Sequence, residues 1–227
     1  MQKSLIIVAA LVALMGAGYA VYSTQTPEVA DTGMTAIQVA DEDADSAAAV
    51  DTTQIQEMSL GNPDADVTVI EYASFTCPHC ANFNATVYKQ LKADYIDTGK
   101  INFIHREVYF DRYGLWAGLV ARCGGEMRYF GLADAIYKTQ KEWLASGTPI
   151  GISDALKKLG RTAGMSNEQL DACLQDAGKA EALYALYQQQ SKADDVTGTP
   201  TFIINGQKYS NMNYADFAAT LNEKLGE

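Results

Sequence analysis

Residues 75–83 read FTCPHCANF, and this stretch places Cys77 and Cys80 three positions apart around a proline and a histidine. Pro78 suits the first turn of a helix, where the amide hydrogen that proline lacks has no intrahelical partner. Apolar residues then recur at helical spacing as far as Tyr95. The stretch therefore predicts a turn into a helix that has Cys77 at its N-terminus.

Four short segments elsewhere have the composition of β-strands. The first is β-branched and apolar on both alternating faces, as in a central strand covered on both sides. Gly99 separates the helix from the second strand, and Asn205-Gly206 is typical of the two-residue turn of a hairpin between the last two. The predicted strands comprise residues 67–72, 101–105, 201–204 and 207–209.

The middle of the chain lacks strand signals, whereas helical ones recur. Ser153 is predicted to begin one helix, Ser166 and Gln169 form the capping-box pattern of another, and Asn213 is predicted to cap a final helix. A β-α-β beginning and a β-β-α ending, separated by a helical block, predict an α/β domain with an inserted helical domain. The predicted parts of the α/β domain are residues 58–111 and 193–227, and the insertion comprises residues 112–192.

The N-terminus has the features of an export signal. Residues 5–15 form an apolar run behind Lys3, and Gly18-Tyr19-Ala20 has the small-x-small pattern that signal peptidase accepts. We expect residues 1–22 to be either a cleaved signal peptide or, through residues 5–22, an uncleaved membrane anchor. In both cases the rest of the chain would lie in an oxidising compartment.

Residues 23–57 contain eight acidic residues and no Lys or Arg. Such a segment cannot bury enough apolar surface to offset its ordering entropy, so we expect an acidic disordered linker. The whole chain has a formal net charge of -11. This charge argues against nucleic acid or an anionic membrane surface as the partner.

A metal site and a structural staple are the first two hypotheses for the cysteine pair. Cys77, His79 and Cys80 are of the residue types that bind zinc, but a structural zinc site needs four ligands. The remaining cysteines, Cys123 and Cys173, are fifty residues apart and do not supply the usual second pair. A disulfide within C-x-x-C closes too small a loop to stabilise the fold much. We therefore expect no metal and no cofactor.

A redox centre uses each residue of the motif. At a helix N-terminus, unpaired amides and the positive end of the helix dipole stabilise an anion, so Cys77 is predicted to be a thiolate. His79 adds positive charge or a hydrogen-bond donor, and Cys80 is within reach to resolve a mixed disulfide. Because a stabilised thiolate favours the reduced form, the pair is predicted to give its disulfide away.

Three residues outside the motif allow different interpretations. Glu71, six positions before Cys77, either titrates with a raised pKa inside the sheet and serves proton transfer, or reaches solvent at a strand end. Pro200 is suited to the first position of a strand, and a cis bond before it has a low base rate. His105 is interpreted as structural, because nothing near it in the sequence makes it a ligand or a base.

Two stretches, VTVIEYASFTCPHCANF (67–83) and VTGTPTFIING (196–206), together resemble the DsbA-like thiol:disulfide oxidoreductases of the bacterial envelope, a branch of the thioredoxin superfamily. The resemblance covers residues 58–227. It rests on Cys-Pro-His-Cys, an acidic residue six positions earlier, and Gly-Thr-Pro ahead of the late strand. It implies a thioredoxin-like fold with an inserted helical domain.

The resemblance also implies roles for single residues. Cys77 would attack and be attacked, Cys80 would resolve, Pro78 and His79 would complete the redox motif, and Glu71 would be the buried acid. Thr199 would precede a cis Pro200 that faces the disulfide, where backbone groups bind an extended substrate strand. Some members carry a second disulfide in the helical domain, and on that similarity we expect a Cys123–Cys173 bond; two small buried thiols are the alternative.

The function implied by the resemblance is donation of the Cys77–Cys80 disulfide to unfolded or partly folded exported proteins. The protein would work in the periplasm, soluble or tethered to the inner membrane, and a quinone-linked membrane partner would reoxidise it. Two alternatives stay open: a disulfide isomerase or dedicated reductant, and a peptide-binding holdase without a redox role.

Overall fold

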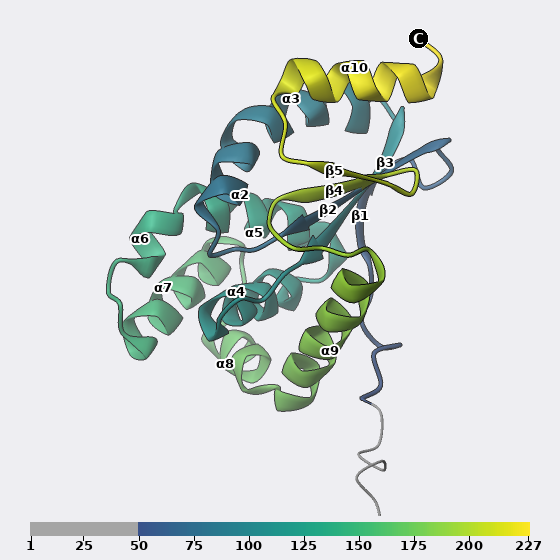
Figure 1. The fold of residues 1–227 in the computed structure, drawn as a ribbon. Coiled ribbons are helices and arrows are strands. Elements are labelled where there is room, and N and C mark those ends of the chain that lie inside the picture. The colour runs from purple at the N-terminus through teal and green to yellow at the C-terminus, as the bar shows by residue number, and fades with distance from the viewer. Residues whose placement is uncertain (1–49) are drawn as a thin grey trace, which may run out of the picture. The chain divides into compact units, whose positions relative to one another are not determined.

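Five strands form one mixed sheet in the computed structural model, which describes residues 50–227 (Figure 1). The order across the sheet is β1-β3-β2-β4-β5, with β2 and β3 parallel and the other neighbouring pairs antiparallel. The central position predicted for the first strand is confirmed, because β2 has neighbours on both sides. The strands are β1 (Met58–Gly61), β2 (Val67–Ala73), β3 (Ile101–Glu107), β4 (Thr201–Ile204) and β5 (Gln207–Ser210).

A continuous helix follows β2 and begins at Pro78, directly after Cys77 in extended conformation. Two segments within it are π-helical, and the helix ends at Ile96, before Gly99, whose φ is 71°. The predicted helix start, extent and stop are therefore confirmed. The helix comprises α2 (Pro78–Phe83), η1 (Asn84–Tyr88), α3 (Lys89–Leu91) and η2 (Lys92–Ile96).

Helices cover both faces of the sheet. Val67, Val69 and the alternate residues of β3 pack against the helix 78–96 and against α10 (Tyr214–Leu225). On the opposite face, Tyr72 packs near Tyr187 of α9. β2 therefore lies between two apolar layers, as its composition predicts.

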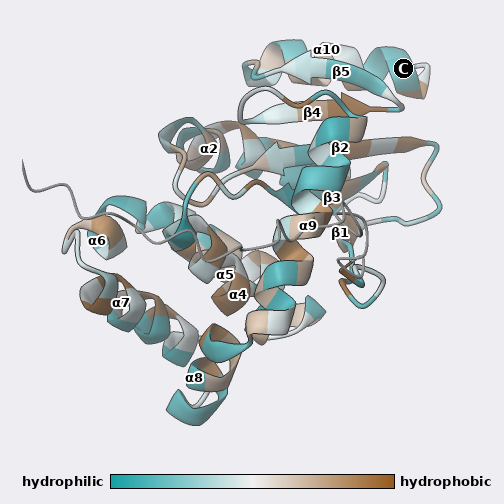
Figure 2. Ribbon diagram, turned by 60° about the horizontal axis from the view of Figure 1, so that its bottom comes forward, coloured by the Kyte–Doolittle hydropathy of each residue, from teal (hydrophilic) through white to brown (hydrophobic). Residues whose placement is uncertain are grey.

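The predicted helical insertion is present between β3 and β4 (Figure 1). Each of its helices carries both hydrophobic and hydrophilic stretches, as expected when one side of a helix is buried (Figure 2). Its apolar core extends to Cys77 and Cys80. The helices are α4 (Arg112–Cys123), α5 (Glu126–Lys138), α6 (Gln140–Leu144), α7 (Pro149–Thr162), α8 (Asn167–Gln175) and α9 (Ala177–Ala193).

One predicted helix start is wrong and two are confirmed. Ser153 lies inside α7, which begins earlier because the Thr148 hydroxyl accepts a hydrogen bond from the Gly151 amide and Pro149 occupies the first turn. The capping box of Ser166 with Gln169 starts α8, and Asn213 caps α10.

The end of the predicted linker is attached to the folded part. The Glu57 carboxylate pairs with the Arg106 guanidinium at 2.8 Å, and the Gln56 carbonyl accepts a hydrogen bond of 2.8 Å from Arg122. These polar contacts need little apolar surface, so composition alone did not indicate them. The predicted export segment and residues 23–49 of the linker lie outside the described residues. Within residues 50–227, no helix has the length and apolar character needed to span a membrane.

Candidate active site

The redox motif lies where β2 ends and α2 begins, and the insertion holds this turn from one side. The hydroxyl of Thr76 donates a hydrogen bond of 2.8 Å to one carboxylate oxygen of Asp111. The other oxygen of Asp111 caps α4 by accepting from the amides of Tyr113 and Gly114. One side chain therefore fixes both the first helix of the insertion and the turn that carries the motif.

Gln140 holds the same turn from another direction. Its buried side-chain amide donates hydrogen bonds of 2.9 Å to the Phe75 carbonyl and 3.0 Å to the Cys77 carbonyl. Gln140 is the first residue of α6, sixty-three positions after Cys77. Sequence reasoning missed it, because a glutamine in a helix carries no local signal of such a contact.

Replacing Gln140 with leucine should lower the free energy of unfolding by about 1–3 kcal/mol, because the Phe75 carbonyl would lose its donor in a buried site. Urea denaturation measures this change. Gln188, exposed on α9, provides the matched control. Its replacement by leucine should change stability by less than about 0.5 kcal/mol, and equal effects of the two substitutions would contradict the assignment.

The two sulfurs of the motif differ strongly in their surroundings. Cys77 keeps 9% of its surface exposed, and Cys80 is fully buried. A hydrogen bond from the Cys80 thiol is the main cause that lowers the Cys77 pKa to about 5, and burial opposes it. Hydrogen bonds from Thr199 and from the backbone amides of Cys80 and His79 lower this pKa further. Burial, and the loss of that hydrogen bond to Cys77, raise the pKa of Cys80. Cys77 is therefore the thiolate at neutral pH, and Cys80 remains a thiol.

Pro78 and His79 are exposed at the start of α2. The contribution of His79 to the low pKa of Cys77 comes from its backbone amide. The sequence left open whether His79 adds positive charge or a hydrogen-bond donor, and the donor is its backbone amide. The helix geometry explains this, because it directs the first amides toward Cys77 and leaves the ring at the surface.

Thr199 and Pro200 lie against the motif just before β4, and the peptide bond between them is cis. The sulfur of Cys77 is 3.5 Å from the Thr199 carbonyl oxygen. Apart from the sulfurs of Cys77 and Cys80, the buried Thr199 hydroxyl has no hydrogen-bond partner among residues 50–227. The structure thus brings together the two distant stretches on which the resemblance rests.

Glu71 is buried in β2, so it does not reach solvent at a strand end. Its neighbours across the sheet are His105 in β3 and Phe202 in β4. Burial, with a smaller contribution from the charge of Cys77, raises the Glu71 pKa from 4.5 to about 8. The carboxyl group is therefore mostly protonated at neutral pH.

This raised pKa makes stability depend on pH. Glu71 binds its proton more tightly in the folded state, so its burial costs stability as pH rises above 4.5, and the cost is complete above about 8. Glu71→Gln removes the titration. Relative to the unchanged protein in the same redox state, the variant should gain about 3 kcal/mol in free energy of unfolding between pH 4.5 and pH 7. A difference between the two proteins that is constant with pH would contradict the raised pKa.

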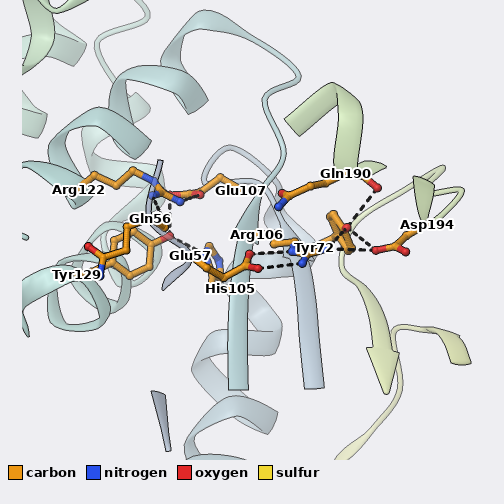
Figure 3. A network of polar contacts seen from close by, with 10 residues as sticks. All are labelled: Gln56, Glu57, Tyr72, His105, Arg106, Glu107, Arg122, Tyr129, Gln190 and Asp194. Carbon is orange, nitrogen blue, oxygen red and sulfur yellow. Dashed lines mark hydrogen bonds and ion pairs between the residues drawn. The ribbon is translucent and has the colours of Figure 1, made fainter. Parts of the chain in front are cut away.

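A buried polar network that sequence reasoning did not foresee joins His105 to Glu107, Arg122, Tyr129 and Tyr137. Figure 3 draws its members other than Tyr137. His105 was interpreted as structural; among residues 50–227 its two ring nitrogens are hydrogen-bonded to the hydroxyl groups of Tyr129 and Tyr137, and its ring packs near Phe75. No prediction was made for Glu107, although the alternation of β3 places its side chain on the same inward face as His105. Its partners on α4 and α5 could not be identified from spacing.

Cys123 and Cys173 form a disulfide, which joins the end of α4 to α8. This is the pairing that the resemblance implied. Among residues 50–227, no three His, Cys, Asp or Glu side chains are placed to hold a metal ion together.

A sheet in this order, with a Cys-Pro-His-Cys motif after β2 and a facing cis-proline before β4, defines the thioredoxin fold, here with a helical insertion. A family model described as Thioredoxin matches residues 53–223, and the chain belongs to this family. It is a DsbA-like member. The crystal structure of Wolbachia pipientis alpha-DsbA1 aligns with a TM-score of 0.69 at 25% identity, covering 75% of this chain and 92% of that chain.

Other relatives carry related names. A Rickettsia bellii protein, provisionally named protein-disulfide oxidoreductase, is 36% identical over 172 residues, which cover 75% of this chain and 65% of the relative. The chain thus spans slightly less than two thirds of that relative. A structure titled protein-disulfide isomerase from Novosphingobium aromaticivorans aligns with a TM-score of 0.65 at 27% identity, covering 75% of this chain and 98% of that chain.

Proposed function

We propose that this protein is a thiol:disulfide oxidoreductase that donates the Cys77–Cys80 disulfide to exported proteins. The observation that carries the proposal is the contrast between the two sulfurs at one helix N-terminus. Cys77 keeps 9% of its surface exposed and has a pKa of about 5, whereas Cys80 is fully buried and has a raised pKa. Attack on the pair therefore occurs at Cys77, and Cys77 is also the better leaving group.

The reaction has two exchange steps. A substrate thiolate attacks the sulfur of Cys77, a mixed disulfide forms, and Cys80 leaves with the electron pair of the broken bond and takes up a proton. Glu71, buried nearby with a pKa of about 8, is our candidate for the donor of that proton. A second substrate thiolate then attacks the substrate sulfur, and Cys77 leaves as a thiolate. The substrate loses two electrons and gains a disulfide.

The substrate would bind beside Thr199 and Pro200. Thr199 lies against Cys77, so an extended polypeptide that reaches the sulfur also reaches the backbone ahead of β4. We infer that unfolded or partly folded chains are the substrates, because only an extended segment can present its backbone in this way. Pro78 and His79, exposed beside the sulfur, would contact the same segment.

A disulfide donor needs an oxidising compartment and a partner that restores its disulfide. We infer a periplasmic location, soluble or tethered through residues 5–22, and reoxidation by a quinone-linked membrane protein. The Rickettsia bellii name and the N-terminal apolar run support this location and role.

Oxidative refolding tests the proposal. The oxidised protein is mixed with a reduced, unfolded protein that has several thiols, and in parallel with the same protein carrying scrambled disulfides. A donor should form disulfides rapidly in the first mixture and rescue little activity in the second. Faster rescue of the scrambled substrate would favour the isomerase reading, which the name of the Novosphingobium structure also suggests. No exchange in either mixture would favour a holdase.

A further inference from the structure

The loop that connects α9 to β4, residues 194–200, contains Pro200 and is called the Pro200 loop below. The structure joins its two ends through one residue of β2. At the end of the loop, the backbone of Tyr72 is paired across the sheet with Thr201. At its start, the Tyr72 hydroxyl donates a hydrogen bond of 2.5 Å to the Asp194 carboxylate. Tyr72 therefore fixes where the Pro200 loop begins relative to where it ends.

Arg106 of β3 completes the contact with Asp194 (Figure 3). It is the cross-strand neighbour of Tyr72, so the two side chains leave the same face of the sheet. Nη1 of Arg106 lies 2.7 Å from the Tyr72 hydroxyl and 3.3 Å from the Asp194 carboxylate. Nε and Nη2 donate to the two carboxylate oxygens of Glu57, at 2.8 and 2.9 Å. One edge of the guanidinium therefore binds Glu57, and Nη1 is directed to the start of the Pro200 loop.

A second charged contact of the Pro200 loop is more exposed to solvent. Nζ of Lys208 lies 2.7 Å from the Asp195 carbonyl and 2.6 Å from its carboxylate. These two side chains are 42% and 83% exposed, and ion pairs so exposed contribute little. The Asp194 side chain is 29% exposed, and its partner Tyr72 is buried. The contact of Asp194 is therefore the better shielded of the two and should restrain the loop more.

The other end of the Pro200 loop presents its backbone to the active site. The carbonyl oxygen of Thr199 lies 3.5 Å from the sulfur of Cys77, and residues 197–198 are exposed beside it. Fixing the backbone of a flexible segment costs conformational entropy. A loop that is already held in the binding conformation spares an incoming polypeptide this cost, so it binds the polypeptide more tightly.

We propose that Asp194 is a positioning residue for the substrate: held by Tyr72 and Arg106, it keeps the Pro200 loop in the conformation that an extended polypeptide binds beside Cys77. This inference rests on the proposed function and deepens it. Asp194 acts through the loop, five positions before Thr199 in the chain. A small disulfide without a peptide backbone has nothing to pair with the loop, so its exchange with Cys77 should not depend on Asp194.

Two mixed disulfides of the same coloured aromatic thiol separate these two kinds of substrate. One contains an unstructured peptide with a single cysteine, and the other contains cysteamine. The thiolate of Cys77 in the reduced, full-length protein attacks the peptide or cysteamine sulfur, forms a disulfide with it and expels the aromatic thiolate. Absorbance follows the expelled thiolate. The readout is the ratio of the peptide and cysteamine rate constants, because a loss of folded protein lowers both equally.

Asp194→Ala and Tyr72→Phe should each lower the peptide rate constant about threefold to tenfold, as expected for one weakened backbone hydrogen bond. Tyr72→Phe should be at the lower end, because Arg106 still reaches Asp194. The cysteamine rate constant should change less than about twofold in both variants. Asp194→Asn keeps an oxygen that can accept from Tyr72, so it should retain most of the ratio.

Glu57→Ala is the matched control, because it removes the other ion pair of the same guanidinium. It should leave the ratio unchanged. An unchanged ratio in folded Asp194→Ala and Tyr72→Phe proteins would overturn the inference, and Tyr72→Phe alone decides if Asp194→Ala does not fold. A loss in Glu57→Ala as large as in Asp194→Ala would also overturn it. Absence of exchange with both disulfides in the unchanged protein would contradict the proposed function itself.

Discussion

Replacing Cys77 with serine is expected to abolish disulfide exchange, with a rate loss of roughly 10³-fold or more to the uncatalysed level. A serine hydroxyl forms no disulfide, and its pKa is far above that of the Cys77 thiol, which is about 5. Exchange with a fluorescent mixed disulfide, followed at pH 7, measures the loss. Since Cys77 is the more exposed cysteine of the pair, no other residue of the motif can replace it.

Cys80→Ser is the matched control for that experiment. Its Cys77 should still attack a disulfide, but the mixed disulfide should accumulate because the buried resolving thiol is missing. Mass measurement detects the trapped adduct. Activity retained in Cys77→Ser, or an adduct formed through Cys80 in that variant, would contradict the account. It would mean that Cys80 is the attacking sulfur and Cys77 the resolving one.

Removal of the Cys123–Cys173 disulfide should have the largest effect on stability. The bond closes a loop with a sequence separation of 50, and chain entropy predicts a loss of about 4 kcal/mol in the free energy of unfolding. Denaturation of the Cys123→Ser/Cys173→Ser protein measures it. The Cys77 thiolate should titrate as before, because the bond joins α4 to α8 and does not hold the turn between β2 and α2 that carries the motif.

The single variants provide the control for that disulfide. Cys123→Ser and Cys173→Ser each break the same bond, so each should lose nearly as much stability as the double variant. Additive losses would mean that the two residues contribute independently, as two separate thiols would. Titration of the oxidised, unfolded protein should find no free thiol, and two free thiols would contradict the bond.

Local chemistry explains why much of the fold was predictable from the sequence. Pro78 after a β-branched run, Asn205-Gly206 between two short strand segments, and Ser166 with Gln169 each act within a few residues, so their effects appear in the sequence. Ser153 misled because any serine resembles a cap until its neighbours are compared. Thr148 with Pro149 is the stronger start.

The contacts that complete the site are long-range and could not be read from local patterns. Gln140 reaches Phe75 over 65 positions, and Tyr129 reaches Glu107 over 22. Which polar side chain meets which buried group depends on how the insertion packs on the sheet. A buried acid such as Glu71 is recognisable as unusual from the sequence, but its partners are not.

The equilibrium of Cys77 and Cys80 with glutathione at pH 7 tests the central claim most directly. The Cys77 pKa of about 5 lies about two units below that of thioredoxin, which stabilises the reduced pair by at most about 3 kcal/mol. Because solvent reaches Cys77 and screens its charge, we halve this figure. The account then predicts a reduction potential about 30 mV above the ~-270 mV of thioredoxin. A potential at or below that of thioredoxin, with a thiolate that titrates near 8.5, would contradict the account.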